Sequence, residues 1–187
     1  LLAEDSNNPG SLGIAISEAI EAVVKSEGKA KYALGSVLGH VLMHQTINGN
    51  EAILQMEQAG DYPDIIVGCT GGGSNLSGLM FPFLGQQLRG GQKIDIIGCE
   101  PLSCPSFTKG KYAYDHGDMA RMTPLIKMHT LGSDFLPPAN HSGGLRYHGM
   151  SYHLSHLYDL GLMRAKAYGQ KDCFEAGVIF GKQEGII

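Results

Sequence analysis

The chain has 187 residues, of which 43% are hydrophobic and 17% charged, a balance typical of one globular domain with a buried core. Its formal net charge of −4 and pI near 6.0 argue against nucleic acid or an anionic membrane as a partner. Because the chain also has neither an apolar run of the roughly 20 residues that span a bilayer nor a signal-peptide pattern, we expect a cytoplasmic protein with a small-molecule ligand.

The first predicted elements are two helices. Apolar residues recur at three- and four-residue spacing over residues 11–25, which indicates an amphipathic helix. The helix-breaking residues Pro9 and Gly10 directly precede it. Ser11 stands where it either caps this helix or faces a ligand together with the first free N–H groups. A second helix is predicted over residues 37–58, interrupted near INGN at residues 47–50.

A strand, a glycine loop, a helix and a second strand follow. DIIVGC (64–69) reads as a strand buried on both faces, and KIDIIGCEP (93–101) as another. Between them, residues 76–88 have a helical pattern, which Pro82 should kink or shorten. Two strands joined by a helix form a βαβ unit, so we predict an α/β fold with a parallel twisted sheet flanked by helices.

The remaining chain alternates between irregular and regular segments. Residues 102–148 contain four prolines and several glycines and read as an irregular region, which in a compact chain is usually functional. A helix is predicted over residues 151–161, a strand over 163–169, and a closing helix from near Asp172.

The glycine loop CTGGGSN (69–75) is the clearest candidate binding site. A glycine turn between a strand and a helix presents free backbone N–H groups and the positive end of the helix dipole, which together bind phosphate. The loop lacks the GK[ST] of a nucleotide triphosphate site, and Leu76 stands where a dinucleotide site needs glycine. A small phosphate monoester therefore fits best, and the alternative is a tight turn in which glycines only relieve crowding.

Other polar residues have competing structural interpretations. His40 and His44 stand at zinc-ligand spacing, as do His153 and His156, but no third ligand is evident and a packed or partly exposed helix face is preferred. Glu100 follows a strand, where it either borders a cofactor or caps the next turn. Core or structural positions are preferred for Cys99 and for four methionines, Met43, Met56, Met80 and Met150. The four cysteines form no CxxC pair, so free thiols are expected.

Six motifs in order resemble one enzyme family. They are GSLGIAISEAIE (10–21), LGSVLGHVLMHQTINGNEA (34–52), PDIIVGCTGGGSN (63–75), GCEP (98–101), FLPPANHSGGLRYHGM (135–150) and EGII (184–187). Together they resemble the β subunit of tryptophan synthase, and GSLGIAISEA and SGGLRYHGM are most similar to its divergent second type. The resemblance implies a fold type II pyridoxal-phosphate (PLP) lyase that condenses L-serine with indole to give L-tryptophan. It also implies a homodimer, with an α subunit as an open further partner.

The resemblance also assigns site residues. In the family the glycine loop binds the cofactor phosphate, which carries over to Gly71, Gly72, Gly73, Ser74 and Asn75, while Ser11 would lie near the cofactor. A monovalent cation, Na⁺ or K⁺, is held in the family by backbone carbonyls that match Thr70, Gly71, Leu145 and Tyr147. Tyr147 would also lie beside the indole tunnel. Arg146 departs from the acidic residue of ordinary β subunits, which puts both gating and docking of an α subunit in doubt.

The family's Schiff-base lysine has no counterpart here. It belongs to an upstream histidine-lysine-x-asparagine motif, which this sequence lacks, as it lacks the family's glutamate after EGII and a later serine. We therefore expect residues 1–187 to be part of a PLP-phosphate-binding domain without its catalytic-lysine region and its C-terminal end, with no catalytic residue and no activity alone. The alternatives are another fold type II PLP enzyme, such as a serine or threonine dehydratase or a cysteine synthase, and a non-catalytic remnant that binds a phosphate ligand.

Overall fold

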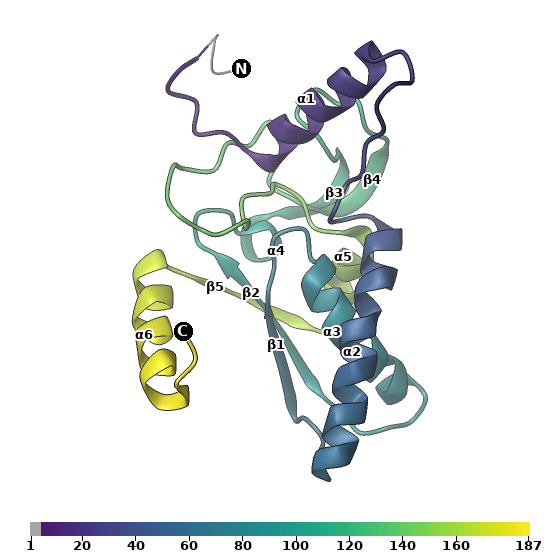
Figure 1. Ribbon diagram of the computed structural model, residues 1–187, viewed down its shortest axis with the longest axis vertical. Coiled ribbons are helices and arrows are strands. Elements are labelled where there is room, and N and C mark those ends of the chain that lie inside the picture. Colours follow the sequence, from purple (N-terminus) through teal and green to yellow (C-terminus); the bar gives the residue numbers. More distant parts are fainter. Residues whose placement is uncertain (1–4) are drawn as a thin grey trace.

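The structure is a computed structural model that describes residues 5–187, folded as a parallel sheet, a separate hairpin and surrounding helices (Figure 1). The elements in chain order are α1 (Leu12–Lys25), α2 (Gly39–Ala59), β1 (Ile65–Cys69), α3 (Ser74–Leu88), β2 (Asp95–Pro101), α4 (Ser106–Lys109), β3 (Lys111–His116), β4 (Leu125–Thr130), α5 (Tyr152–Asp159), β5 (Arg164–Tyr168) and α6 (Gln170–Glu184).

The sheet has the strand order β1-β2-β5, and both pairs are parallel. Its register places Cys69 opposite Cys99 and Pro101 opposite Tyr168, so the three carboxyl ends meet at one edge. At the other end, Arg164 binds Asp95 at 2.6 Å. The predicted α/β class is confirmed, and ligands of such sheets bind beyond the carboxyl ends of the strands.

Helices α2 and α3 cover one face of the sheet (Figure 1). Ile66 and Ile96 of the strands are buried against Leu76 and Met80 of α3. The two helices cross closely at Gly49, where an added Cβ would lie 2.4 Å from the Leu79 carbonyl oxygen. The predicted interruption near INGN is therefore wrong, since α2 is continuous and its glycine permits the crossing. Nor does Pro82 shorten α3, which continues to Leu88.

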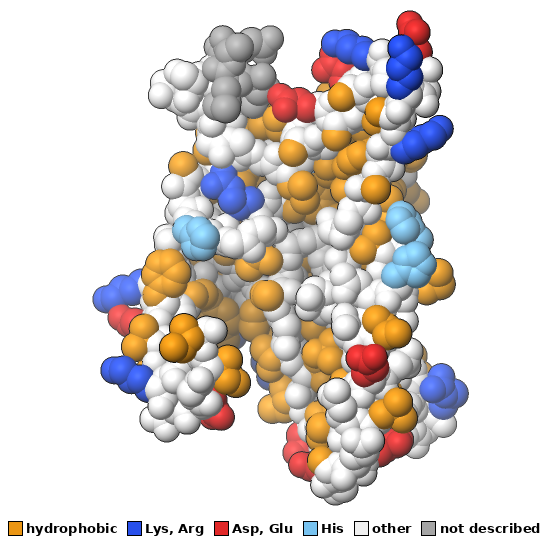
Figure 2. Space-filling view, viewed as in Figure 1, with side chains coloured by type: hydrophobic (Ala, Val, Ile, Leu, Met, Phe, Trp, Pro, Cys, Tyr) orange, Lys and Arg blue, Asp and Glu red, His pale blue; other side chains and the backbone are white. Residues whose placement is uncertain are grey.

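The opposite face of the sheet is open over β1. Ile65 and Val67 are 53% and 54% exposed, so the prediction of a strand buried on both faces is wrong, because no element within residues 5–187 covers these side chains. Helix α6 likewise exposes Phe174 and Ile179, and hydrophobic side chains are visible at the surface of the molecule in Figure 2. Met43 is 62% exposed on α2 and is not a core residue, whereas Met80 and Met150 are fully buried as predicted.

The segment predicted to be irregular contains a hairpin and a short helix. Strands β3 and β4 pair antiparallel, with Tyr112 opposite His129, and α4 precedes them. The hairpin was missed because its strands carry charged and polar residues and its connection, residues 117–124, is long and contains Pro124. Residues 131–148 do lack regular elements.

Two histidines of this region are buried without a charged partner in contact. The ring of His129 stacks on Tyr112 with centroids 4.9 Å apart, and both its nitrogens lack a hydrogen-bond partner. The ring of His148 contacts the His116 carbonyl oxygen through Nε2 at 2.8 Å. Burial lowers the pKa of both histidines below the ordinary value, because desolvation disfavours the imidazolium.

The folded protein should therefore lose stability as the pH falls below about 6.5, the ordinary histidine pKa. Below that value the unfolded chain binds protons that the folded chain excludes, which costs at most about 1.4 kcal/mol per pH unit for each histidine. Urea unfolding at pH 7.5, 6.5 and 5.5 measures this slope. The variant His129→Phe should flatten this slope, and the variant His44→Phe, at an exposed position, should not. An equal slope in the unsubstituted protein and both variants would show that burial of His129 does not cause the loss of stability.

Candidate functional site

The glycine loop joins the carboxyl end of β1 to the first turn of α3. Thr70 anchors its start, since its backbone N–H and its Oγ1 donate to the Cys99 carbonyl oxygen at 2.7 and 3.2 Å. Gly73, with φ of 93°, is the N-cap of α3 and provides no side-chain cap. Since no side chain caps this end, the first N–H groups of α3 are suited to an anion.

Each glycine of the loop also faces a close neighbour. An added Cβ would lie 2.4 Å from Val37 Cγ2 at Gly72, 2.7 Å from Met150 Sδ at Gly73, and 3.0 Å from the Gly144 carbonyl oxygen at Gly71. The glycines thus relieve crowding, which is the role that the alternative interpretation of a tight turn gave them. Residues 144–151 and 36–37 therefore pack closely around the loop and fix its shape.

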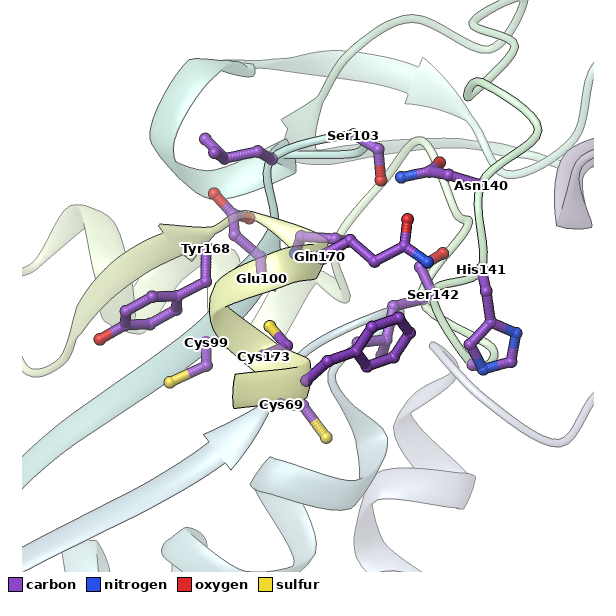
Figure 3. A pocket seen from close by; sticks show the side chains of 15 residues that line it. Cys69, Cys99, Glu100, Ser103, Asn140, His141, Ser142, Tyr168, Gln170 and Cys173 are labelled. Carbon is purple, nitrogen blue, oxygen red and sulfur yellow. The ribbon is translucent and has the colours of Figure 1, made fainter. Parts of the chain in front are cut away.

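A cavity of about 260 Å³ lies at the carboxyl edge of the sheet (Figure 3). Its walls come from the ends of β1, β2 and β5, from residues 140–145 and from the start of α6. Three buried polar atoms of its lining have no hydrogen-bond partner, namely Ser103 Oγ, Asn140 Oδ1 and Ser142 Oγ. Buried polar atoms are normally satisfied, so this lining is suited to a ligand that carries polar groups.

Glu100 lies at the end of β2 and is only 2% exposed. Its Oε2 accepts from the Phe107 N–H at 2.9 Å, and its Oε1 accepts from the Thr108 N–H and Oγ1 at 2.8 and 2.6 Å. The carboxylate therefore holds the first turn of α4, as the capping alternative proposed. Glu100 also lines the cavity, so its contact with a cofactor stays a prediction.

Ser11 caps α1, and Arg146 connects the N-terminal segment to the loop before Tyr147. Ser11 Oγ accepts from the Ile14 N–H at 3.2 Å and caps α1, but Ser11 is not part of the cavity lining. The guanidinium of Arg146 donates to the carbonyl oxygens of Gly10 at 2.8 Å, Pro9 at 2.9 Å and Pro137 at 3.2 Å. Arg146 thus holds the 137–146 loop against the start of α1.

Tyr147 is buried against a second cavity, also of about 260 Å³. Its hydroxyl donates to the Gly117 carbonyl oxygen at 2.7 Å, and burial raises its pKa. Ile16, Val37, Met128 and other apolar side chains line this space. Of the predicted cation ligands, Gly71 adjoins Gly144 and Leu145, and the Tyr147 carbonyl oxygen accepts from Cys104 Sγ at 3.1 Å.

Among residues 5–187, no group of three histidine, cysteine or acidic side chains is arranged to hold a metal ion. His40 and His44 are exposed, with ring centroids 6.3 Å apart. All four cysteines are free, and burial raises the pKa of Cys104 to about 11. Cys69, Cys99 and Cys173 line the cavity at the sheet edge, and burial, followed by the other two thiols, raises the pKa of Cys99.

No lysine in the described part of the chain belongs to the lining of the cavity at the sheet edge. Lys127 Nζ lies 4.3 Å from the ring centroid of Tyr112, and Lys166 Nζ lies 5.3 Å from that of Tyr168.

Within residues 5–187, no helix combines the length and the apolar composition needed to cross a membrane.

The chain is similar to known proteins along its whole length, although no family model matches it. It is 55% identical over 187 residues to tryptophan synthase beta chain 2 of Thermotoga maritima and 54% identical over 187 residues to that of Aeropyrum pernix, covering 100% of this chain and 44% and 42% of theirs. A crystal structure of a T.th. threonine deaminase has a TM-score of 0.63 at 13% identity, over 90% of this chain and 53% of that chain, and shows the shared fold.

The chain thus spans less than half the length of the curated relatives that it matches. The identity extends from the α1 segment through the glycine loop to the end of α6, and therefore includes every element that builds the two cavities. Along its whole length, the chain is homologous to tryptophan synthase beta chains.

Proposed function

We propose that the chain is part of a PLP-dependent lyase that condenses L-serine with indole to give L-tryptophan. The observation that carries the proposal is the cavity at the sheet edge, whose lining holds three unpartnered polar atoms and whose Leu145 wall adjoins Gly71 of the glycine loop. The name of the relatives, tryptophan synthase beta chain, supports this reaction at 52–55% identity.

The residues present fit PLP as a cofactor. The N–H groups of residues 71–75, with the side chains of Ser74 and Asn75, would hold the phosphate through the start of α3. The cavity between Glu100, Ser142 and Leu145 would take the pyridine ring. When bound, PLP acts as the electron sink for chemistry at the α carbon of an amino acid. This chain would hold and orient the cofactor and exclude water from it.

Residues 1–187 would then form part of the phosphate-binding domain. A lysine must bond the cofactor during such catalysis, and no lysine in residues 5–187 lines the cavity. The proposal therefore assigns the catalytic lysine to a segment of the enzyme outside this sequence.

Indole would occupy the apolar cavity beside Tyr147. Its lining is dominated by aliphatic side chains, and the tyrosine hydroxyl is already engaged by Gly117, so an apolar ring is favoured over a polar substrate. The carbonyl oxygens of Thr70, Gly71, Leu145 and Tyr147 would bind Na⁺ or K⁺. We further propose a cytoplasmic homodimer, in which Ser11 lies near the cofactor and an α subunit is an additional partner.

Turnover of the full natural protein that carries this sequence tests the proposal. With PLP and L-serine present, we expect L-tryptophan to form only when indole is added. Release of pyruvate from L-serine to the same extent with and without indole would instead identify a dehydratase. Absence of PLP binding by the full protein would identify a non-catalytic remnant.

A further inference from the structure

The connection between β3 and β4, residues 117–124, is fastened to α1 by a buried carboxylate. Asp118 is 0% exposed. Its Oδ1 accepts from the Thr123 N–H and Oγ1 at 2.9 and 2.8 Å, and its Oδ2 accepts from Ser17 Oγ at 2.7 Å and the Met122 N–H at 3.1 Å. Four donors thus surround one carboxylate and hold its charged form.

Two further bonds close the same junction from the side of α1. Ser17 Oγ accepts from the Ala120 N–H at 2.9 Å, and the Gly13 carbonyl oxygen accepts from the Met119 N–H at 3.2 Å. Although burial alone would raise the pKa of Asp118, the hydrogen bonds from Thr123 and Ser17 keep it below its ordinary value. Ser17 is the residue shared by both sets of bonds. Its hydroxyl lies 2.7 Å from Asp118 Oδ2, nearer than its other acceptor, the Gly13 carbonyl oxygen at 3.1 Å, and it accepts from the connection.

This junction joins two walls of the apolar cavity beside Tyr147. Helix α1 contributes Ile16 and Ile20 to one wall, and the connection contributes Thr123 and Pro124 to another. Thr123 Oγ1 is engaged by Asp118, and it also accepts from the Gly117 N–H at 2.8 Å. The hydroxyl of Thr123 is therefore engaged within the wall, and Thr123 and Pro124 contribute to a lining that is mostly apolar.

We propose that Ser17 and Asp118 are positioning residues that fix the width of this cavity for a flat aromatic ligand. The inference rests on the proposed function, since indole is the ligand that the reaction would place there. When the wall is already ordered before the ligand enters, binding does not include the entropic cost of ordering it, and the affinity is higher. Loosening the junction should weaken binding of the aromatic ligand and leave the cofactor cavity, with its separate lining, unchanged.

The test uses the full PLP-loaded protein and indole as the probe. The 187 residues contain no tryptophan, so a tryptophan-free version of the full protein makes the fluorescence of indole itself the binding signal. Because hydrogen bonds to charged groups are among the stronger ones, we expect Ser17→Ala to weaken indole binding and raise the KM for indole roughly tenfold. The kcat and the KM for L-serine should not change, and Ser17→Thr, which keeps a hydroxyl, should restore indole binding.

Ser26→Ala is the matched control on the same helix. Ser26 Oγ likewise donates to a carbonyl oxygen of its own helix, that of Val23, and accepts from a backbone N–H, that of Ala30, but it lines neither cavity. Equal indole affinity in Ser17→Ala and the unsubstituted protein, or an equal rise in the KM for L-serine, would overturn the positioning role. Failure of the unsubstituted protein to bind indole saturably would overturn the proposed function and with it the ligand of this cavity.

Discussion

Replacing Gly73 with alanine is expected to weaken PLP binding by the full protein by at least about tenfold. The backbone at Gly73 has φ of 93°, which costs a residue with a Cβ roughly 1–2 kcal/mol. The new Cβ would also lie 2.7 Å from Met150 Sδ and 3.2 Å from Leu154 Cδ2, both in fully buried side chains. Since Gly73 is the N-cap of α3, relief of this clash must move the N–H groups proposed to hold the phosphate.

Gly90→Ala separates the two contributions. Gly90 has φ of 94°, and an added Cβ there would meet no atom within 4 Å. Both variants therefore carry the same backbone strain, and only Gly73→Ala adds the steric contact. Titration of each protein with PLP, followed by absorbance, gives the two affinities. Equal affinity in the two variants would show that the glycine loop does not hold the cofactor.

Local periodicity predicts the elements that carry a clear apolar pattern. The spacing in residues 11–25 locates α1 to within a residue, and the apolar runs before and after the glycine loop correspond to β1 and β2. Ser11 caps α1, one of its two predicted roles. These features depend on interactions between residues that are near in sequence, which a pattern can report.

Features that depend on distant partners were not predictable in this way. The continuity of α2 through Gly49 depends on the approach of Leu79 from α3. The exposure of Ile65 and Val67 depends on which elements lie against the sheet, since the sequence of β1 is apolar on both faces. The β3–β4 hairpin is held by pairing across an eight-residue connection and by Asp118, neither of which gives a local signal.

The candidate site divides along the same line. The glycine loop is contiguous and was recognised from its residues, whereas the cavity beside it collects side chains from positions 69 to 174. Ser103, Asn140 and Ser142 were not singled out, although Asn140 and Ser142 lie within the segment FLPPANHSGGLRYHGM (135–150) that carries part of the family resemblance. Their common property, a buried polar atom without a partner, exists only in three dimensions.

Replacing Glu100 with alanine is expected to lower the free energy of unfolding by about 1–3 kcal/mol. The change leaves the buried N–H of Phe107 without its acceptor, and a buried donor left unpaired costs about that much, whereas the N–H and hydroxyl of exposed Thr108 can turn to water. Because total stability is only about 5–15 kcal/mol for a domain, urea unfolding of the full protein should show a clear shift of the midpoint.

Two further variants decide whether the carboxylate or merely the side-chain volume is responsible. Glu100→Gln keeps the shape of the side chain but replaces one acceptor oxygen with a donor group. It should therefore lose less stability than Glu100→Ala. Exposed Glu57→Ala on α2 should change little. If Glu100→Gln is as unstable as Glu100→Ala, both carboxylate oxygens are needed to fasten α4 beside the cavity. If Glu100→Ala is as stable as Glu57→Ala, the carboxylate does not fasten α4.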